Sequence, residues 1–232
     1  LAREERATAA LTKRWVAAWR RISLDLADLI TQIERDRLAG AQPTRGRLYR
    51  QEQAQALLRQ IRAELDELTG DADRVIRDAQ ADEVTAALED APRLALAAAG
   101  DETVAQRLAA QWTHVPADAL TMLTGTLQPG TPLNALLGEL GTATAAGISE
   151  RLTSGLAVGR NPRGIARGIR DDWGIGLNRA LRISRTEILR SYRSANLYQY
   201  QQNGHIIKGW RWVASFSSRT CIACLLQHGK VF

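Results

Sequence analysis

An uninterrupted run of helix-forming residues opens the chain and limits what it can fold into. Residues 2–39 contain no proline or glycine and are rich in alanine, arginine, leucine and glutamate, which favours a long helix. The larger apolar side chains recur at alternating intervals of four and three residues: Trp15, Trp19, Ile22, Leu26, Leu29 and Ile33. This spacing places them on one side of the helix and predicts a heptad seam that packs against another helix.

A second seam follows a break in the chain. Residues 40–46 contain glycine and proline and end the first helix, because proline removes a backbone donor and glycine relaxes the backbone. The second seam has the same heptad spacing: Leu58, Ile61, Leu65, Leu68, Ala72, Val75 and Ala79. Two stripes joined by a short turn predict an antiparallel helical hairpin. The alternative, in which each stripe packs on a separate chain of an oligomer, satisfies the same pattern.

A third helix is predicted over the alanine- and leucine-rich residues 92–112. Residues 124–132 hold several glycines, prolines and threonines and predict a loop. Thr131 followed by Pro132 is a helix start, because threonine caps free backbone N–H groups and proline is favoured at the first helical position. The helix that begins there is expected to reach about Leu156.

Two further helices are predicted in the last third of the chain. Asn161 followed by Pro162 repeats the start signal and predicts a short helix that residues 171–176 end. A longer helix is predicted from Leu177 to the Asn203-Gly204 pair, which is typical of a helix end.

The chain acquires β character after Gly204, where strand-forming residues gather: Ile206, Ile207, Trp210, Trp212 and Val213. The last two residues, Val231 and Phe232, are expected to pair with them across the intervening turn. We therefore predict a mainly α protein, with a long helical hairpin or bundle as its N-terminal region, residues 1–130. The C-terminal domain, residues 131–232, is predicted to be helical and to end in a small β-hairpin or knuckle.

The net charge of +6 is unevenly distributed along the chain. Residues 1–150 hold 17 basic and 22 acidic residues, whereas residues 151–212 hold 12 basic and three acidic ones. Eleven of those 12 basic residues are arginines: Arg151, Arg160, Arg163, Arg167, Arg170, Arg179, Arg182, Arg185, Arg190, Arg193 and Arg211. Arginine matches phosphate or carboxylate with a planar fork. The surplus indicates either a helix face paired with acidic residues of the first block or a surface that faces a polyanion.

Several classes of protein are disfavoured by the composition. No run approaches the roughly 18 apolar residues of a transmembrane helix, and the N-terminus lacks a basic-then-apolar signal layout. Two cysteines in 232 residues do not make a secreted disulfide framework. A soluble protein made in a cytoplasm is therefore expected.

Both cysteines lie on one predicted turn, Cys221-x-x-Cys224, a spacing that allows zinc to take two thiolates. A closed structural site needs four ligands. His228 lies within local reach and His205 approaches if the strands pair, but the chain has no second cysteine pair. Two small buried cysteines on a turn are the alternative. A thioredoxin-like redox pair fits less well, because the βαβ context is missing.

The arginine-rich helix predicted from Leu177 has one acidic residue, Glu187, which is placed to pair with Arg190 at i, i+3. An exposed arginine stripe without a catalytic acid pair indicates binding rather than turnover. Trp210 and Trp212 share a face of the predicted strand and favour a small core over a base-stacking platform. The chain has no Walker loop, dinucleotide fingerprint, nucleophile elbow or His-Glu-x-x-His motif, so we expect no enzymatic activity.

One succession of motifs in the last third of the chain resembles the Mu F-like minor head proteins, which are head-morphogenesis proteins of tailed double-stranded DNA phages. The motifs that carry the resemblance are Ser184-Arg185-Thr186-Glu187, Asn196, Gly204, Trp210-Arg211-Trp212, Arg219-Thr220-Cys221-Ile222-Ala223-Cys224 and Gly229. The resemblance covers about residues 160–232 and makes residues 131–232 the head-morphogenesis domain. The family suggests a variable helical N-terminal part.

The resemblance also implies where a metal would bind. The family pattern continues past the glycine into a stretch with a histidine and a further cysteine pair. Cys221 and Cys224 are then half of a structural zinc site whose other ligands lie beyond Phe232, and His228 is a weaker candidate.

A non-enzymatic structural role is what the resemblance implies for the whole protein. Such proteins enter the procapsid in few copies, associate with the portal protein, lie inside the head near the portal and travel with the genome on ejection. Major capsid or scaffolding protein is a further partner, no membrane is involved in the mature head, and the protein is made in the bacterial host cytoplasm. Non-specific contact with packaged double-stranded DNA is assigned to Arg160, Arg163, Arg167, Arg170, Arg182, Arg190 and Arg193.

Two other functions fit parts of the sequence. Mu F-like modules also precede effector domains, so the chain is alternatively the docking or delivery part of a phage-associated toxin. A zinc-dependent nucleic-acid-binding protein is the third hypothesis, and it predicts sequence-selective DNA binding, whereas the head-protein hypothesis predicts portal association with little base preference.

Overall fold

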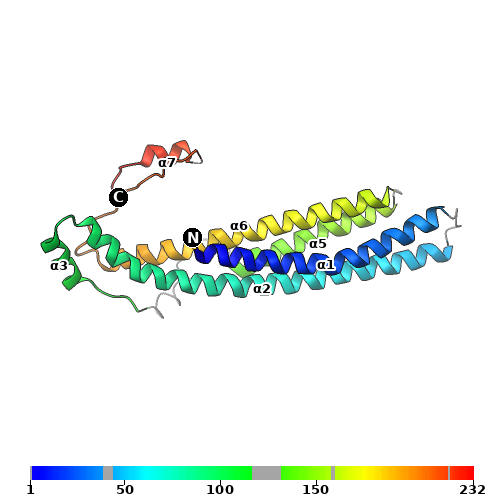
Figure 1. Cartoon of the computed structure of the whole chain (residues 1–232), viewed down its shortest axis with the longest axis horizontal. Coiled ribbons are helices and arrows are strands. Elements are labelled where there is room, and N and C mark those ends of the chain that lie inside the picture. Colours follow the sequence, from blue (N-terminus) through cyan, green and yellow to red (C-terminus); the bar gives the residue numbers. More distant parts are fainter. Residues whose placement is uncertain (1, 39–43, 117–131, 158–159, 219) are drawn as a thin grey trace. The chain divides into compact units, whose positions relative to one another are not determined.

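A computed structural model describes residues 2–38, 44–116, 132–157, 160–218 and 220–232 of the protein, and in these ranges the chain is mainly helical (Figure 1). The helices are α1 (Ala2–Leu38), α2 (Thr44–Ala98), α3 (Glu102–Gln111), α5 (Leu133–Ala157), α6 (Pro162–Gln202) and α7 (Ile222–Gln227). The prediction of a mainly α protein is thus confirmed.

The chain packs as two compact units. Unit 1 combines Leu1–Glu83 with Gln128–Ser191, and unit 2 combines Val84–Leu127 with Tyr192–Phe232. Each unit is formed by two ranges that are distant in the sequence. The predicted division into residues 1–130 and 131–232 is not tested by this packing and stays a prediction. None of the described helices is long and apolar enough to cross a membrane.

Unit 1 is a bundle in which α1, α5 and the greater parts of α2 and α6 run alongside one another (Figure 1). Both predicted seams lie in its core, where α5 and α6 add further apolar residues. The core includes Trp15, Ile22, Leu26, Leu29, Ile61, Leu65, Leu68, Ala72, Leu137, Leu140, Ile148, Leu152, Ile165, Ile169, Trp173 and Ile188. The two seams therefore meet in one core within the chain, which α5 and α6 complete.

Two tryptophans tie α1 to α6. The indole Nε1 of Trp15 donates to the backbone oxygen of Trp173 at 3.1 Å, and Nε1 of Trp173 donates to the backbone oxygen of Trp15 at 3.4 Å. The ring centroids lie 5.2 Å apart, and both residues are buried. A Cβ on Gly176 would come within 3.0 Å of the Trp15 ring, so glycine at this position allows the two helices to approach. Each buried indole N–H thus has a partner away from water.

The predicted helix end at residues 171–176 is wrong, because α6 runs without interruption from Pro162 to Gln202. Residues 173 and 176 pack against Trp15, and this tertiary packing outweighs the weak helix propensity of the glycines. The predicted start is confirmed: the side-chain oxygen of Asn161 accepts a hydrogen bond from the backbone N–H of Arg163 at 3.0 Å.

The helix predicted over residues 92–112 is shown in part, because the stretch is shared by two helices. Helix α2 continues through Pro92 to Ala98, and α3 begins separately at Glu102. Gly100 has a positive φ of 68°, which glycine adopts without steric cost, and it separates the two helices. The next helix, α5, begins at Leu133 and ends at Ala157, one residue from the predicted end. The predicted loop at 124–132 lies largely outside the described residues.

Unit 2 is held by a smaller core and by one buried asparagine. Val84, Ala87 and Ala195 are buried together. The side chain of Asn203 accepts from the backbone N–H of Thr113 at 2.7 Å and donates to the Thr113 oxygen at 3.0 Å. Helix α6 ends directly before Asn203, as predicted, and this side chain joins the helix end to the segment after α3.

Glu187 lies in a small buried polar layer of unit 1. Its side chain is 5% exposed and pairs with Arg190 at 2.9 Å, which confirms the predicted i, i+3 pair. Burial raises the pKa of the Glu187 carboxyl, and the Arg190 charge opposes this shift only in part. The neighbouring serines Ser184 and Ser191 are fully buried. Glu187 is thus a structural group whose charge is poorly solvated.

The predicted C-terminal β-hairpin is not shown. The described residues at this end contain only an isolated antiparallel bridge between Arg211 and Val231. The backbone N–H of Trp210 donates to Phe232 at 3.0 Å, and the return bond is 2.9 Å long. The expected partners therefore meet, but over too few residues to make strands, and the segment between them includes the six-residue helix α7. We call residues 209–232 the C-terminal knuckle.

The tryptophan pair leads to a first testable expectation. Changing Trp15→Phe removes the N–H that pairs with Trp173 and part of a buried ring, so the free energy of unfolding should fall by about 1–3 kcal/mol. Trp210→Phe is the matched control, since that residue is 46% exposed, and it should change this free energy by less than about 0.5 kcal/mol. Urea unfolding measures both, and equal losses at the two positions would contradict the assignment.

The raised pKa of Glu187 predicts a pH dependence. The folded protein holds this proton at higher pH than the unfolded chain, so the contribution of Glu187 to stability rises as the pH falls through the folded pKa. Glu187→Gln cannot ionise, and we expect a higher Tm than wild type at pH 7 and a smaller difference at pH 4. Thermal unfolding between these pH values checks this, with the exposed Glu89→Gln as the control; a lower Tm for Glu187→Gln at pH 7 would refute it.

Candidate functional site

Three of the arginines predicted to contact DNA are paired with carboxylates. Arg163 lies 3.1 Å from Glu34, and Arg170 lies 3.1 Å from the neighbouring Asp171. The third is Arg190, which pairs with the buried Glu187 described above. Arg163 and Glu34 are 129 residues apart in the sequence, so the interpretation that arginines pair with acidic residues of the first block holds for this pair. These three cations are partly neutralised within the fold.

Two arginines outside the predicted set are paired in the same way. Arg151 makes two hydrogen bonds to Asp172, at 2.5 and 2.9 Å, and its side chain crosses over Gly168, where a Cβ would clash with the arginine. This fork raises the already high pKa of Arg151. The arginine at position 185, on α6, donates to the buried Glu4 of α1 at 2.7 Å. Ion pairing between helices therefore uses three of the eleven arginines of this block.

The remaining predicted arginines have no carboxylate partner among the described residues. They are Arg160, Arg167, Arg182 and Arg193, and all four are exposed. Arg167 and Arg182 are 15 residues apart on α6. This separation is slightly more than about four helical turns, so the two residues lie on nearly the same side of the helix. Arg179 is also exposed and unpaired in the described part of the chain; it stands in the same arginine-rich block but lies outside the predicted set. These side chains are available to an anion from outside.

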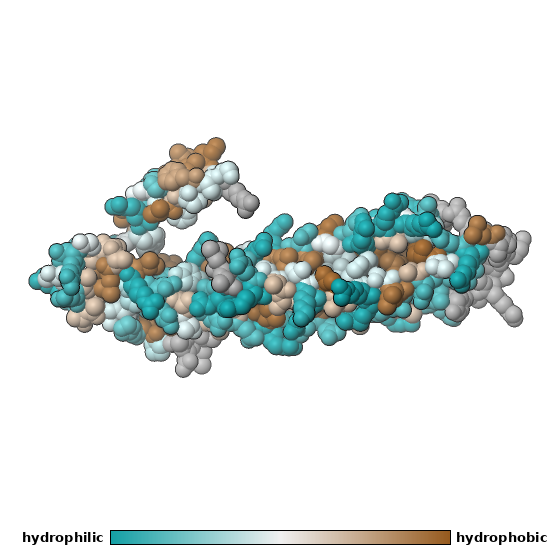
Figure 2. Space-filling view, viewed as in Figure 1, coloured by the Kyte–Doolittle hydropathy of each residue, from teal (hydrophilic) through white to brown (hydrophobic). Residues whose placement is uncertain are grey.

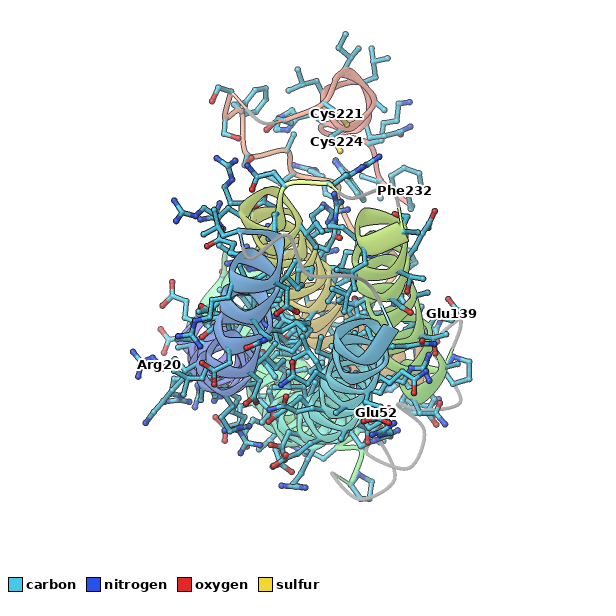
Figure 3. All side chains as sticks on the ribbon, turned by 90° about the vertical axis from the view of Figure 1, so that its right-hand side faces the viewer. Arg20, Glu52, Glu139, Cys221, Cys224 and Phe232 are labelled. Atoms are coloured by element: carbon cyan, nitrogen blue, oxygen red, sulfur yellow. The ribbon has the colours of Figure 1, made fainter. Side chains whose placement is uncertain are left out.

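The two thiols of the C-terminal knuckle lie together at the start of α7 (Figure 3). The sulfur of Cys221 accepts from the backbone N–H of Cys224 at 3.4 Å. Hydrogen bonds from the backbone and thiol of Cys224 lower the pKa of Cys221, and the bond to Cys221 raises the pKa of Cys224. Cys221 is exposed and Cys224 is half-buried, so the alternative of two buried cysteines is wrong.

His228 does not join the two thiols. Its Nδ1 accepts a hydrogen bond from the backbone N–H of Ala214 at 3.2 Å, and its ring lies edge-on to Phe216 with the centroids 4.5 Å apart. With Nδ1 accepting, the proton of the neutral ring lies on Nε2, which leaves no free lone pair for a metal. His205 contacts the backbone oxygen of Gln111.

The described residues therefore bring together two donors of the predicted zinc site. Throughout the described ranges, no group of three or more His, Cys, Asp and Glu side chains is placed to hold a metal ion. Zinc in a structural site takes four ligands, so Cys221 and Cys224 do not close one alone. The prediction that further ligands follow Phe232 stays a prediction.

The tryptophans of the C-terminal knuckle are not core residues. Trp210 is 46% and Trp212 is 42% exposed, so the prediction that they cover a small core is wrong. The structure also draws attention to Phe216, which the sequence pattern did not single out. Phe216 is 66% exposed and has a positive φ of 51°. Non-glycine residues rarely adopt a positive φ, so the presence of a phenylalanine does not predict one.

Comparison with known proteins agrees with the resemblance noted in the sequence. No curated protein and no solved structure matches the chain. A family model described as Phage Mu protein F like protein matches residues 146–232. The matched residues include the second part of α5, all of α6 and the C-terminal knuckle. Over this segment, the chain is similar to the Phage Mu protein F like family.

Proposed function

We propose that the chain is a structural head-morphogenesis protein of a tailed double-stranded DNA phage, located inside the capsid and associated with the portal. The observation that carries this proposal is the match of residues 146–232 to the Phage Mu protein F like family. The protein acts through binding surfaces and catalyses no reaction. It enters the virion in few copies.

The fold supports a structural role. In unit 1, the four helices bury a continuous apolar core and are cross-connected by the reciprocal indole bonds of Trp15 and Trp173. Ion pairs such as Arg185–Glu4 and Arg163–Glu34 join α6 to α1. A bundle held at several levels presents its surface residues in fixed positions, which lowers the conformational cost of binding.

Contact with packaged DNA is the second element of the proposal. Arg160, Arg167 and Arg182 of unit 1 are exposed and free of carboxylate partners among the described residues. Guanidinium groups of this kind bind phosphate oxygens without reading base sequence. A zinc-dependent regulator, by contrast, needs a closed metal site, and the described residues supply two of its four donors.

Portal association is tested by co-expression of the full chain with the portal protein of the same phage. We expect the chain to be retained when a tagged portal ring is purified, and to be found in purified virions by mass spectrometry. A tagged major capsid protein serves as the comparison for specificity. Virions that lack the chain, together with no retention on the portal ring, would overturn the proposed function.

DNA contact is tested with duplex DNA of arbitrary sequence at increasing salt. Replacing Arg167 and Arg182 by alanine should weaken binding, and the slope of log affinity against log salt should become shallower by about one for each phosphate that is no longer neutralised. The matched control replaces Arg163 and Arg190, which are already paired with carboxylates. Binding that is insensitive to salt, or equal weakening in the two double variants, would count against this surface.

A further inference from the structure

Three arginines of the predicted DNA-binding set share one face at the start of α6. Arg163, Arg167 and Arg170 stand at positions i, i+4 and i+7, which lie within about 60° of one another around a helix. All three are exposed. Figure 2 shows hydrophilic residues over the stretch where Figure 1 places the first turns of α6. We call these three residues the α6 arginine cluster.

Two members of the cluster are paired with carboxylates and one is not. Arg163 lies 3.1 Å from Glu34 of α1, and Arg170 lies 3.1 Å from Asp171. Arg167 has no carboxylate partner among the described residues. Like charges three or four residues apart on a helix repel one another, so the two carboxylates relieve this repulsion in the free protein. A phosphate placed against the cluster would relieve it in the same way.

The exposure of each carboxylate decides whether its arginine can turn to an anion from outside. In the other ion pairs of this arginine-rich block, the side chains of Glu187, Glu4 and Asp172 are only 5%, 10% and 17% exposed. Loss of the arginine would leave each of them as a buried charge without a partner, which is costly. The side chains of Asp171 and Glu34 are 62% and 35% exposed, so water can solvate them after the arginine has left.

The geometry of the two contacts in the cluster is also that of weak ion pairs. The side chain of Arg163 is 77% exposed and makes one hydrogen bond to its carboxylate, from Nε at 3.1 Å. Arg170 and Asp171 are consecutive on the helix and do not face each other, and both nitrogens of the arginine reach the same oxygen. Arg151, by contrast, bonds both oxygens of Asp172. The pairs of the α6 arginine cluster are therefore the ones that a phosphate can displace.

We propose that the α6 arginine cluster is one phosphate-binding site for duplex DNA, in which the carboxylates of Glu34 and Asp171 pair with two of the arginines until DNA phosphates displace them. The proposal rests on the proposed function, in which packaged DNA is the polyanion. The cluster spans about 10 Å along α6, a distance over which one strand of a duplex presents about three phosphates. Glu34 and Asp171 then limit the affinity for DNA, because each must release its arginine first.

The deciding variant is Glu34→Gln in the full chain, which removes the carboxylate charge and keeps the size of the side chain. We expect the Kd for duplex DNA of arbitrary sequence to fall about two- to fivefold, because Arg163 no longer has to leave an ion pair. The same change in an Arg163→Ala background should have no effect, since the arginine that it releases is absent. Asp171→Asn tests the second pair in the same way, with Arg170→Ala as its background.

The matched control for net charge is Asp25→Asn. Asp25 is exposed on α1 and has no ion pair in the described part of the chain. It lies nine residues from Glu34, about 13 Å along the helix, which exceeds the Debye length at physiological salt. We expect this variant to change the Kd by less than about twofold.

Each outcome of this experiment decides the proposal. A wild-type chain that does not bind duplex DNA at low salt would overturn both the proposed DNA contact and this site. An equal or higher Kd for Glu34→Gln would reject the site and leave DNA contact by Arg167 and Arg182 intact. A gain in affinity that persists without Arg163, or that Asp25→Asn reproduces, is a general effect of charge and would also reject it.

Thermal unfolding separates an exchangeable pair from a structural one. A fall in Tm of more than about 4 °C in Glu34→Gln would show that the pair stabilises the fold, and would contradict its displacement by phosphate. A gain in DNA affinity that requires Arg163, with a Tm close to that of wild type, supports the proposal.

Discussion

The reciprocal bonds between Trp15 and Trp173 are the contact on which the rest of unit 1 depends. Each indole donates to the other residue's backbone, so helix α6 must pass α1 at one height and in one orientation. Gly176 permits the approach, and the adjoining ion pairs follow from the register that this contact sets. The apolar side of α6 is buried in this core, and Arg167 and Arg182 of the same helix remain exposed.

Much of the fold follows from residue patterns, and the exceptions have a common cause. The heptad spacing of α1 and α2, and the Asn161-Pro162 start of α6, are local signals that the structure confirms. The predicted helix end at residues 171–176 failed because packing against Trp15 carries the glycines through, and α2 also continues through Pro92, where a new helix was predicted to start. The β-hairpin failed because strand formers such as Val213 stay exposed, and the described residues contain no sheet that they could join.

The residue types of the candidate sites could be predicted from the sequence, but the residues that they contact could not. The residue pattern identified the arginine surplus and the Cys221–Cys224 spacing. Only the fold shows which arginines form ion pairs with Glu34, Asp171 or Glu187. It likewise shows that His228 turns toward Ala214 and away from the thiols. Phe216 could not be found in the sequence, because its significance lies in a backbone angle that the surrounding serines and threonine impose.

The segment that matches the family model shares its core with helices outside it. The matched segment begins inside α5, yet its residues Ile148, Ile165 and Ile169 are buried in a core that also contains Ile22 and Ile61, far outside the segment. A fragment trimmed to residues 146–232 would lose that covering and expose an apolar face along α6. The matched residues therefore do not bury their own apolar side chains completely, and α1 and α2 cover the rest.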